Sequence, residues 1–157
     1  MTEKFREALI DVFCQVLEQV AFAFGEETPK EELPSDELAN YLHCEVGFRG
    51  PCKGTIAITL PFEFCKELAA NALGIEQDEM APGMAEDSLK EIGNVTCGQW
   101  ITAVAGKKAV FDLTVPEVKA LDEAAWVELR DSSSSIAMLV DDVPALIGVS
   151  VTGDMPE

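Results

Sequence analysis

The stretch EDSLKEIGNVTCGQW, residues 86–100, places polar and less polar side chains on opposite sides of a predicted helix. The less polar side is formed by residues at helical spacing: Leu89, Ile92, Thr96, Trp100 and, just beyond the stretch, Ala103. At about 100° per residue, the opposite side carries a row of residues within a sector of roughly 60°: Asp87, Glu91, Asn94 and Gly98. This pattern predicts a long helix from Met84 to about Val104, ended by Gly106.

The residues before this helix predict a helix, a pair of strands and a shorter helix. Apolar residues at spacings of three and four indicate the first helix, and runs of β-prone residues around a Gly-Pro turn indicate the strands. The expected elements are a helix over residues 3–24 stopped by Gly25, an acidic surface connection over 26–37, a hairpin of strands 41–48 and 54–60, and a helix over 62–73 that starts at Pro61 and closes at Gly74.

The residues after the long helix change to a strand-like pattern. The expected strands lie within residues 110–118, 125–131, 135–142 and 145–153, with a serine-rich turn at Ser132–Ser135 between the second and the third. Because hairpins stand beside helices instead of alternating with them, the order favours an α+β fold with an antiparallel sheet, two long helices and a shorter one. We expect one domain over residues 1–157.

The spacing of Asp87, Glu91 and Asn94 recurs in the first predicted helix. The residues at the equivalent positions there are Asp11, Gln15 and Glu18. Each of the two helices is followed by strand-like sequence, as a duplicated half-domain would be. The frequency of acidic and amide residues leaves chance as a rival explanation, so the sequence alone does not decide between the two.

The composition excludes several classes of function. The chain has 29 acidic and 11 basic residues and a net charge of -18, which would repel nucleic acid and an anionic membrane surface. No apolar stretch reaches the roughly 20 residues of a membrane-spanning helix, and the amino terminus lacks the pattern of a secretory signal, so we expect a cytoplasmic protein. Five cysteines without a C-x-x-C pair predict reduced core thiols and no metal site.

The polar row on the long helix has two interpretations. An exposed helix with acidic and amide residues at this spacing is ordinarily a solvated surface. Alternatively, the Asn94 amide could orient a water molecule while Glu91, one turn away, pairs with a cation of a partner. Because an amide has no useful basicity, this second interpretation suits a reaction limited by positioning, such as phosphoryl hydrolysis.

The same residues resemble the motif of the CheC, CheX and FliY phosphatases of bacterial chemotaxis. That motif is an Asp or Ser, three residues, a Glu, two residues, an Asn, and a Pro just over twenty residues later. The matching residues here are Asp87, Glu91, Asn94 and Pro116, together with Gly98 and Thr102. The similarity extends to the order of the elements along nearly the whole chain, and CheX is the nearest member because only one helix carries an intact motif.

This resemblance implies a CheC-like fold with pseudo-duplicated halves, a homodimer, and hydrolysis of the aspartyl phosphate of a CheY-like receiver. It implies that Glu91 and Asn94 are catalytic and that Asp87, Gly98 and Pro116 contact the partner. The Mg²⁺ ion would belong to the phosphorylated receiver, so the chain would need no cofactor of its own. A receiver-binding adaptor or flagellar-switch module without activity is the alternative, and an acidic scaffold or small-molecule sensor has no motif in its favour.

Overall fold

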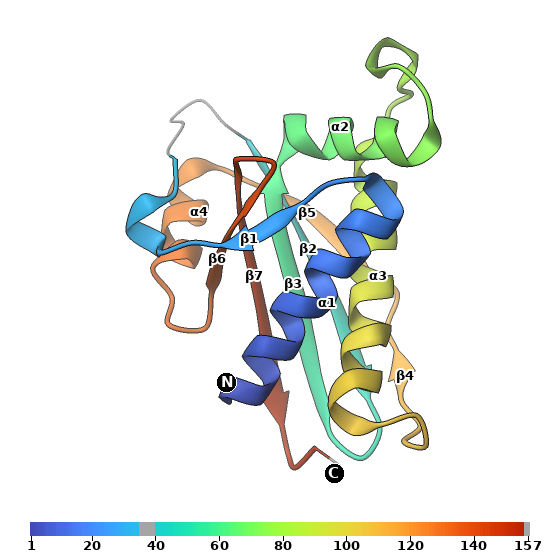
Figure 1. The fold of residues 1–157 in the computed structure, drawn as a ribbon, viewed down its shortest axis with the longest axis vertical. Helices are drawn as coiled ribbons and strands as arrows, with labels where there is room; N and C mark the ends of the chain where they lie inside the picture. The colour runs from blue at the N-terminus through green and yellow to red at the C-terminus, as the bar shows by residue number, and fades with distance from the viewer. Residues whose placement is uncertain (35–39, 156–157) are drawn as a thin grey trace.

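The computed structural model describes residues 1–34 and 40–155, which form four α-helices, two short 3₁₀-helices and seven strands (Figure 1). In chain order the elements are α1 (Glu3–Ala21), β1 (Gly25–Glu27), η1 (Lys30–Glu32), β2 (Tyr41–Arg49), β3 (Lys53–Pro61), α2 (Phe62–Leu73), η2 (Gln77–Glu79), α3 (Met84–Ala105), β4 (Asp112–Leu113), β5 (Glu117–Leu121), α4 (Glu123–Arg130), β6 (Ile136–Val140) and β7 (Val143–Thr152). None of these helices combines the length and apolar character needed to span a bilayer.

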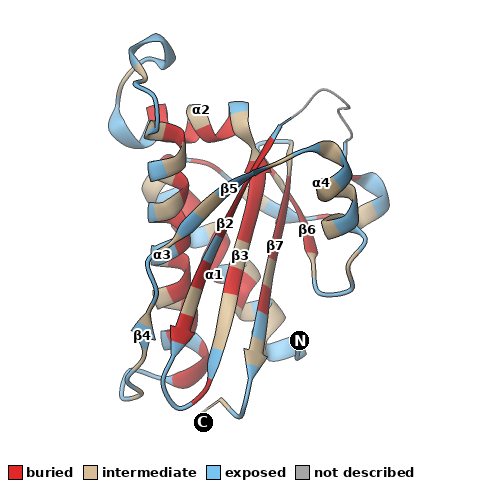
Figure 2. Cartoon of the chain, turned by 180° about the vertical axis from the view of Figure 1, so that it is seen from behind, coloured by how far each residue is buried: buried red, intermediate tan, exposed pale blue. Residues whose placement is uncertain are grey.

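The strands form one antiparallel sheet in the order β1-β6-β7-β3-β2-β4, with β5 also paired to β2. Helices α1, α2 and α3 lie on one face and share the larger hydrophobic core with it, whereas α4 lies on the other face (Figures 1 and 2). The residues of α1 and α3 that face the sheet are buried, and the residues on their outer sides are exposed. Figure 2 shows this for α3, whose ribbon alternates between buried and exposed residues. The predicted α+β fold with an antiparallel sheet is therefore confirmed.

The strand order is symmetric about its central pair, β3 and β7. Each half of the chain supplies a long helix, a short strand and a hairpin, and each short strand pairs with the hairpin of the other half: β1 with β6, and β5 with β2. Helices α1 and α3 are equivalent in this arrangement and lie side by side on the same face (Figure 1). The topology therefore has the pseudo-duplicated form that the family resemblance implied.

Trp100 anchors α3 in the larger core. Its ring is completely buried between α1 and β2, with ring centroids 5.4 Å from Phe5 and 5.6 Å from Phe48. Its indole N–H donates a hydrogen bond of 3.1 Å to the carbonyl oxygen of Phe5. Because the two long helices and the sheet meet at this side chain, the orientation of α3 is fixed along its length.

The start of the chain differs from the prediction in two ways. Helix α1 ends at Ala21 instead of residue 24, because Phe22 adopts a left-handed conformation with φ of 55°. This turn redirects the chain, so that Gly25–Glu27 forms β1 and pairs with β6. The predicted surface connection over 26–37 was therefore wrong in its first residues, and residues 35–39 lie outside the described part of the chain.

The strand predicted over residues 125–131 was wrong. This segment belongs to α4, because the Asp122 side chain accepts a hydrogen bond of 2.9 Å from the Ala125 N–H and caps the helix. Trp126 is buried and stacks on Tyr41 at 4.2 Å, so the apolar side of this short helix covers the second face of the sheet. Ser132–Ser135 consequently joins a helix to β6 and is not a hairpin turn.

All five cysteines are free, and four of them are buried. Burial raises the pKa of Cys44 to about 11 and the pKa values of Cys65 and Cys97 to about 12. These three thiols are therefore protonated at neutral pH and belong to the apolar core, as the sequence predicted.

Candidate functional site

Helix α3 carries the candidate site on its exposed side, and its other side packs on the core. One side is buried against α1 and the sheet, and Gly93 lies at the closest approach to β2. A Cβ atom at this position would come within 2.8 Å of the Cys44 sulfur and 3.3 Å of a Val46 methyl carbon. The glycine therefore allows the helix to lie directly on the strand.

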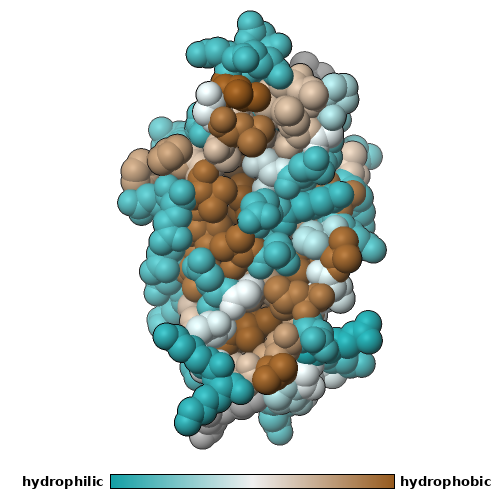
Figure 3. All heavy atoms as spheres, turned by 90° about the vertical axis from the view of Figure 1, so that its right-hand side faces the viewer, coloured by the Kyte–Doolittle hydropathy of each residue, from teal (hydrophilic) through white to brown (hydrophobic). Residues whose placement is uncertain are grey.

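The other side of α3 presents Asp87, Glu91 and Asn94 to solvent. All three side chains are exposed, and they line a shallow hollow of about 380 Å³ together with Lys90 and residues 113–116. We call this the α3–β4 hollow; it lies on the side of the molecule that Figure 3 turns toward the viewer. Within the described part of the chain, neither Glu91 nor Asn94 forms a side-chain hydrogen bond or an ion pair, so both are free to bind a partner.

The opposite wall of the α3–β4 hollow is the segment between β4 and β5. Thr114 fixes this segment to β2, since its N–H donates to the Gly47 carbonyl at 2.9 Å and its hydroxyl accepts from the Gly47 N–H at 2.8 Å. Pro116 follows and is half-buried beside the polar row of α3. The strand predicted over residues 110–118 is thus interrupted here, and the interruption brings Pro116 to the same hollow as Asn94.

Gly98 lies one turn beyond Asn94 and does not line the hollow. A Cβ atom there would meet only Leu113, at 4.0 Å, so the protein itself does not require a glycine at this position. The Thr102 hydroxyl donates a hydrogen bond of 3.2 Å to the Gly98 carbonyl, which links these two residues along the helix. Of the five predicted site residues, four line one hollow, and Gly98 adjoins it as an unfilled patch of helix surface.

Sequence reasoning missed Lys90 and the residues around Val115. Lys90 precedes Asn94 by four positions, so a helical projection could have placed both on neighbouring parts of one face. Val115 is 82% exposed at the rim of the hollow, but its position depends on the break between β4 and β5, which the strand pattern concealed. These two residues add a cation and an apolar contact to the predicted set.

The side chains of Glu91 and Asn94 can bind a polar partner through hydrogen bonds and charge, without a covalent bond. The Asn94 amide can both donate to and accept from a water molecule or an oxygen, and the Glu91 carboxylate one turn away can accept from a cationic donor. The regular helix between Met84 and Ala105 holds the two side chains at a constant separation. No cluster of three or more His, Cys, Asp or Glu side chains suited to a metal ion occurs in residues 1–34 and 40–155.

The equivalent face of α1 does not reproduce the site. Asp11, Gln15 and Glu18 are exposed, as their counterparts on α3 are. However, a carboxylate stands at Glu18 where α3 has the amide of Asn94. The α1 face therefore carries its amide at Gln15, one turn before the position at which α3 carries Asn94, and does not repeat the order of carboxylate and amide found on α3.

In the comparison with known families, the matched part of the chain contains this site. The sequence profile described as "Chemotaxis phosphatase CheX" matches residues 42–139, which is more than half of the chain. The chain belongs to the CheX family. The CheX match includes all of α3 and the segment opposite it, and the predicted resemblance is confirmed. No curated protein matches the chain significantly.

Solved structures of similar fold cover nearly the whole chain. CheX from Desulfovibrio desulfuricans has a TM-score of 0.69 at 15% identity, covering 94% of this chain and 99% of that one. A CheC-like superfamily protein from Shewanella sp. PV-4 has a TM-score of 0.68 at 21% identity, covering 98% and 100%. CheX in the CheX-CheY-BeF3-Mg+2 complex from Borrelia burgdorferi has a TM-score of 0.64 at 18% identity, covering 94% and 97%. These similarities establish the CheC-like fold.

Proposed function

We propose that this protein hydrolyses the aspartyl phosphate of a CheY-like response regulator in bacterial chemotaxis. The observation that carries the proposal is the pair Glu91 and Asn94, one turn apart on a helix and exposed at an open hollow. Neither side chain has a hydrogen-bond or ion-pair partner among residues 1–34 and 40–155. Membership of the chemotaxis phosphatase family and the fold shared with a CheX that was crystallised with CheY support it.

The proposed reaction needs positioning more than new chemistry. Glu91 pairs with the active-site lysine of the receiver and holds α3 across the mouth of its site. Asn94 enters that site and orients a water molecule in line with the phosphorus–oxygen bond, so the water attacks phosphorus and the receiver's aspartate leaves. The magnesium ion of the phosphorylated receiver balances charge on the phosphoryl oxygens. Asp87, Gly98 and Pro116 contact the receiver around this point.

Glu91 tests the anchoring part of this proposal. Glu91→Ala is expected to raise the KM for the phosphorylated receiver by about tenfold or more, because the partner's lysine then loses its carboxylate in a desolvated contact. The measurement is a time course of phosphate loss from the receiver at several receiver concentrations. Glu67→Ala is the control, since it removes an exposed carboxylate from α2, away from the hollow. Equal KM values for the two variants would contradict the anchoring role.

The protein is also proposed to form a homodimer, which rests on its similarity to CheX. Strands β1 and β4 end the sheet order and offer unpaired backbone groups to another chain. Light scattering is expected to give about twice the 17.0 kDa mass of one chain. A mass of one chain at every concentration up to the limit of solubility would contradict this expectation.

A further inference from the structure

Lys90 is the one cationic side chain among the described residues that line the α3–β4 hollow. It lies on the same face of α3 as Asn94, one turn earlier, where side chains four positions apart are neighbours. Asp87 and Glu91 flank it, yet Lys90 forms no ion pair within the part of the chain that the structure describes. Its positive charge is therefore available to a molecule that enters the hollow.

Lys90 lies at the boundary between two hollows. A second hollow of about 420 Å³ adjoins the first, and both are lined by Lys90 and Pro116. Lys90 is half-buried at this boundary, where a lysine can bury part of its aliphatic chain and keep its ammonium group in contact with solvent. In the second hollow Lys90 lies beside residues of β2 and β5, and its charge opposes the effect of burial, which raises the pKa of the Cys44 thiol to about 11.

Because the whole chain is acidic, a cation in this hollow would favour binding of a negatively charged group there. A net charge of -18 opposes the approach of an aspartyl phosphate, because its phosphoryl oxygens carry negative charge. The hollow itself adds the carboxylates of Asp87 and Glu91. Lys90, one turn from the Asn94 amide, supplies the positive charge of this hollow and offsets part of the charge of the two carboxylates. Lysine suits this task since its ammonium group is a flexible point charge that binds oxyanions.

We propose that Lys90 is a partner-specificity residue that binds an oxyanion of the phosphorylated receiver next to the group oriented by Asn94. This inference rests on the proposed function and adds to it a charged contact that neither the CheX motif nor the predicted site contains. The oxyanion is either a phosphoryl oxygen or a carboxylate beside it, and both are bound by the same ammonium chemistry. In either case Lys90 acts on the association of the two proteins and Asn94 acts on the chemical step.

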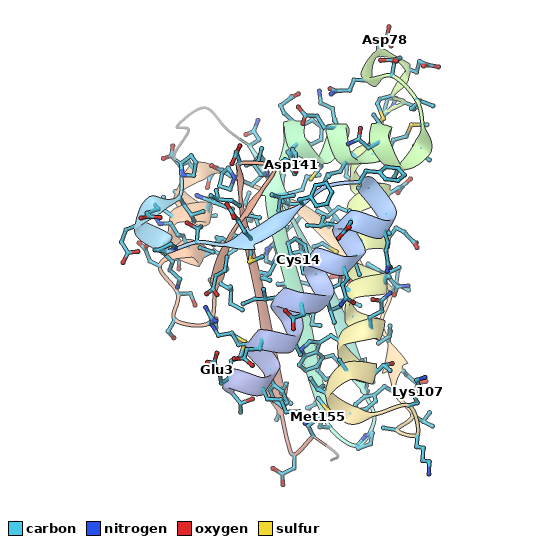
Figure 4. All side chains as sticks on the ribbon, in the orientation of Figure 1. Glu3, Cys14, Asp78, Lys107, Asp141 and Met155 are labelled. Atoms are coloured by element: carbon cyan, nitrogen blue, oxygen red, sulfur yellow. The ribbon has the colours of Figure 1, made fainter. Side chains whose placement is uncertain are left out.

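The test compares Lys90→Gln with Lys107→Gln in dephosphorylation of the receiver at low and high salt. Lys107 is exposed just beyond the other end of α3 and controls for the change in net charge (Figure 4). Lys90→Gln is expected to raise KM by about fivefold at low salt, with kcat within about twofold of the original protein. The increase should shrink toward about twofold in 0.5 M salt, where charges are screened over a few ångströms. Lys90→Arg should recover most of the affinity.

A binding measurement separates this inference from the proposed function. In an Asn94→Ala background, the added Lys90→Gln change is expected to weaken binding of the phosphorylated receiver by about fivefold. If the loss is confined to the phosphorylated receiver, Lys90 binds the phosphoryl group; if it extends to the unphosphorylated receiver, Lys90 binds a carboxylate. Affinities for Lys90→Gln and Lys107→Gln that agree at low salt would overturn the inference. That result would leave the proposed phosphatase intact if Asn94→Ala still slows hydrolysis by about 100-fold or more.

Discussion

Replacing Asn94 with alanine is expected to slow dephosphorylation of the receiver by about 100-fold or more, with the effect in kcat. The exposed amide has no partner within the described residues, so the only interactions that the change removes are those with the bound receiver and its attacking water. Alanine also favours a helix interior more than asparagine does, so the free energy of unfolding should stay equal or rise by a few tenths of a kcal/mol. We therefore expect Asn94→Ala to lower kcat without lowering the free energy of unfolding.

The measurement is a single-turnover time course with the phosphorylated receiver, together with a urea melt of each variant. Asn71→Ala is the matched control, because Asn71 is an exposed asparagine on α2, outside the hollow. Asn71→Ala should give the same time course of dephosphorylation as the original protein. Full activity of Asn94→Ala would refute the proposed mechanism. If the original protein binds the receiver but leaves its phosphate lifetime unchanged, the chain is a receiver-binding module of the same fold.

The site was largely predictable because a helix imposes its own geometry on sequence spacing. Once residues 84–104 are assigned to a helix, Asp87, Glu91 and Asn94 must share one exposed side, and the structure places them so. Pro116 is different, because its position beside α3 depends on the break between β4 and β5 and on the Thr114–Gly47 hydrogen bonds. It could be assigned only through the family resemblance.

The errors in the fold have local causes that a pattern of apolar residues does not reveal. Residues 125–131 resemble a strand in sequence, but the Asp122 cap and the burial of Trp126 against Tyr41 stabilise a helix over Glu123–Arg130 instead. Strand β1 has only three residues and exists because β6 offers it a partner from the other end of the chain. Such long-range pairing overrides weak local propensity, and a single sequence gives no sign of it.

The largest expected loss of stability comes from Trp100→Ala, which should lower the free energy of unfolding by about 3–5 kcal/mol. The indole is completely buried where α1, α3 and β2 meet, so alanine leaves a cavity between elements that cannot readily close. The change also leaves the Phe5 carbonyl without the 3.1 Å hydrogen bond from the indole N–H. Because α1 and α3 are the equivalent helices of the two halves, the loss affects the packing of both on the sheet.

Trp100→Phe separates the two contributions in the same urea melts. Phenylalanine keeps an aromatic ring against Phe5 and Phe48 but cannot donate to the Phe5 carbonyl, so we expect a smaller loss of about 1–3 kcal/mol. The order of stability should therefore be the original protein, then Trp100→Phe, then Trp100→Ala. A loss below about 1 kcal/mol for Trp100→Ala would mean that the site can collapse around a missing ring. In that case the rigid placement of α3, on which the alignment of Glu91 and Asn94 depends, would need another anchor.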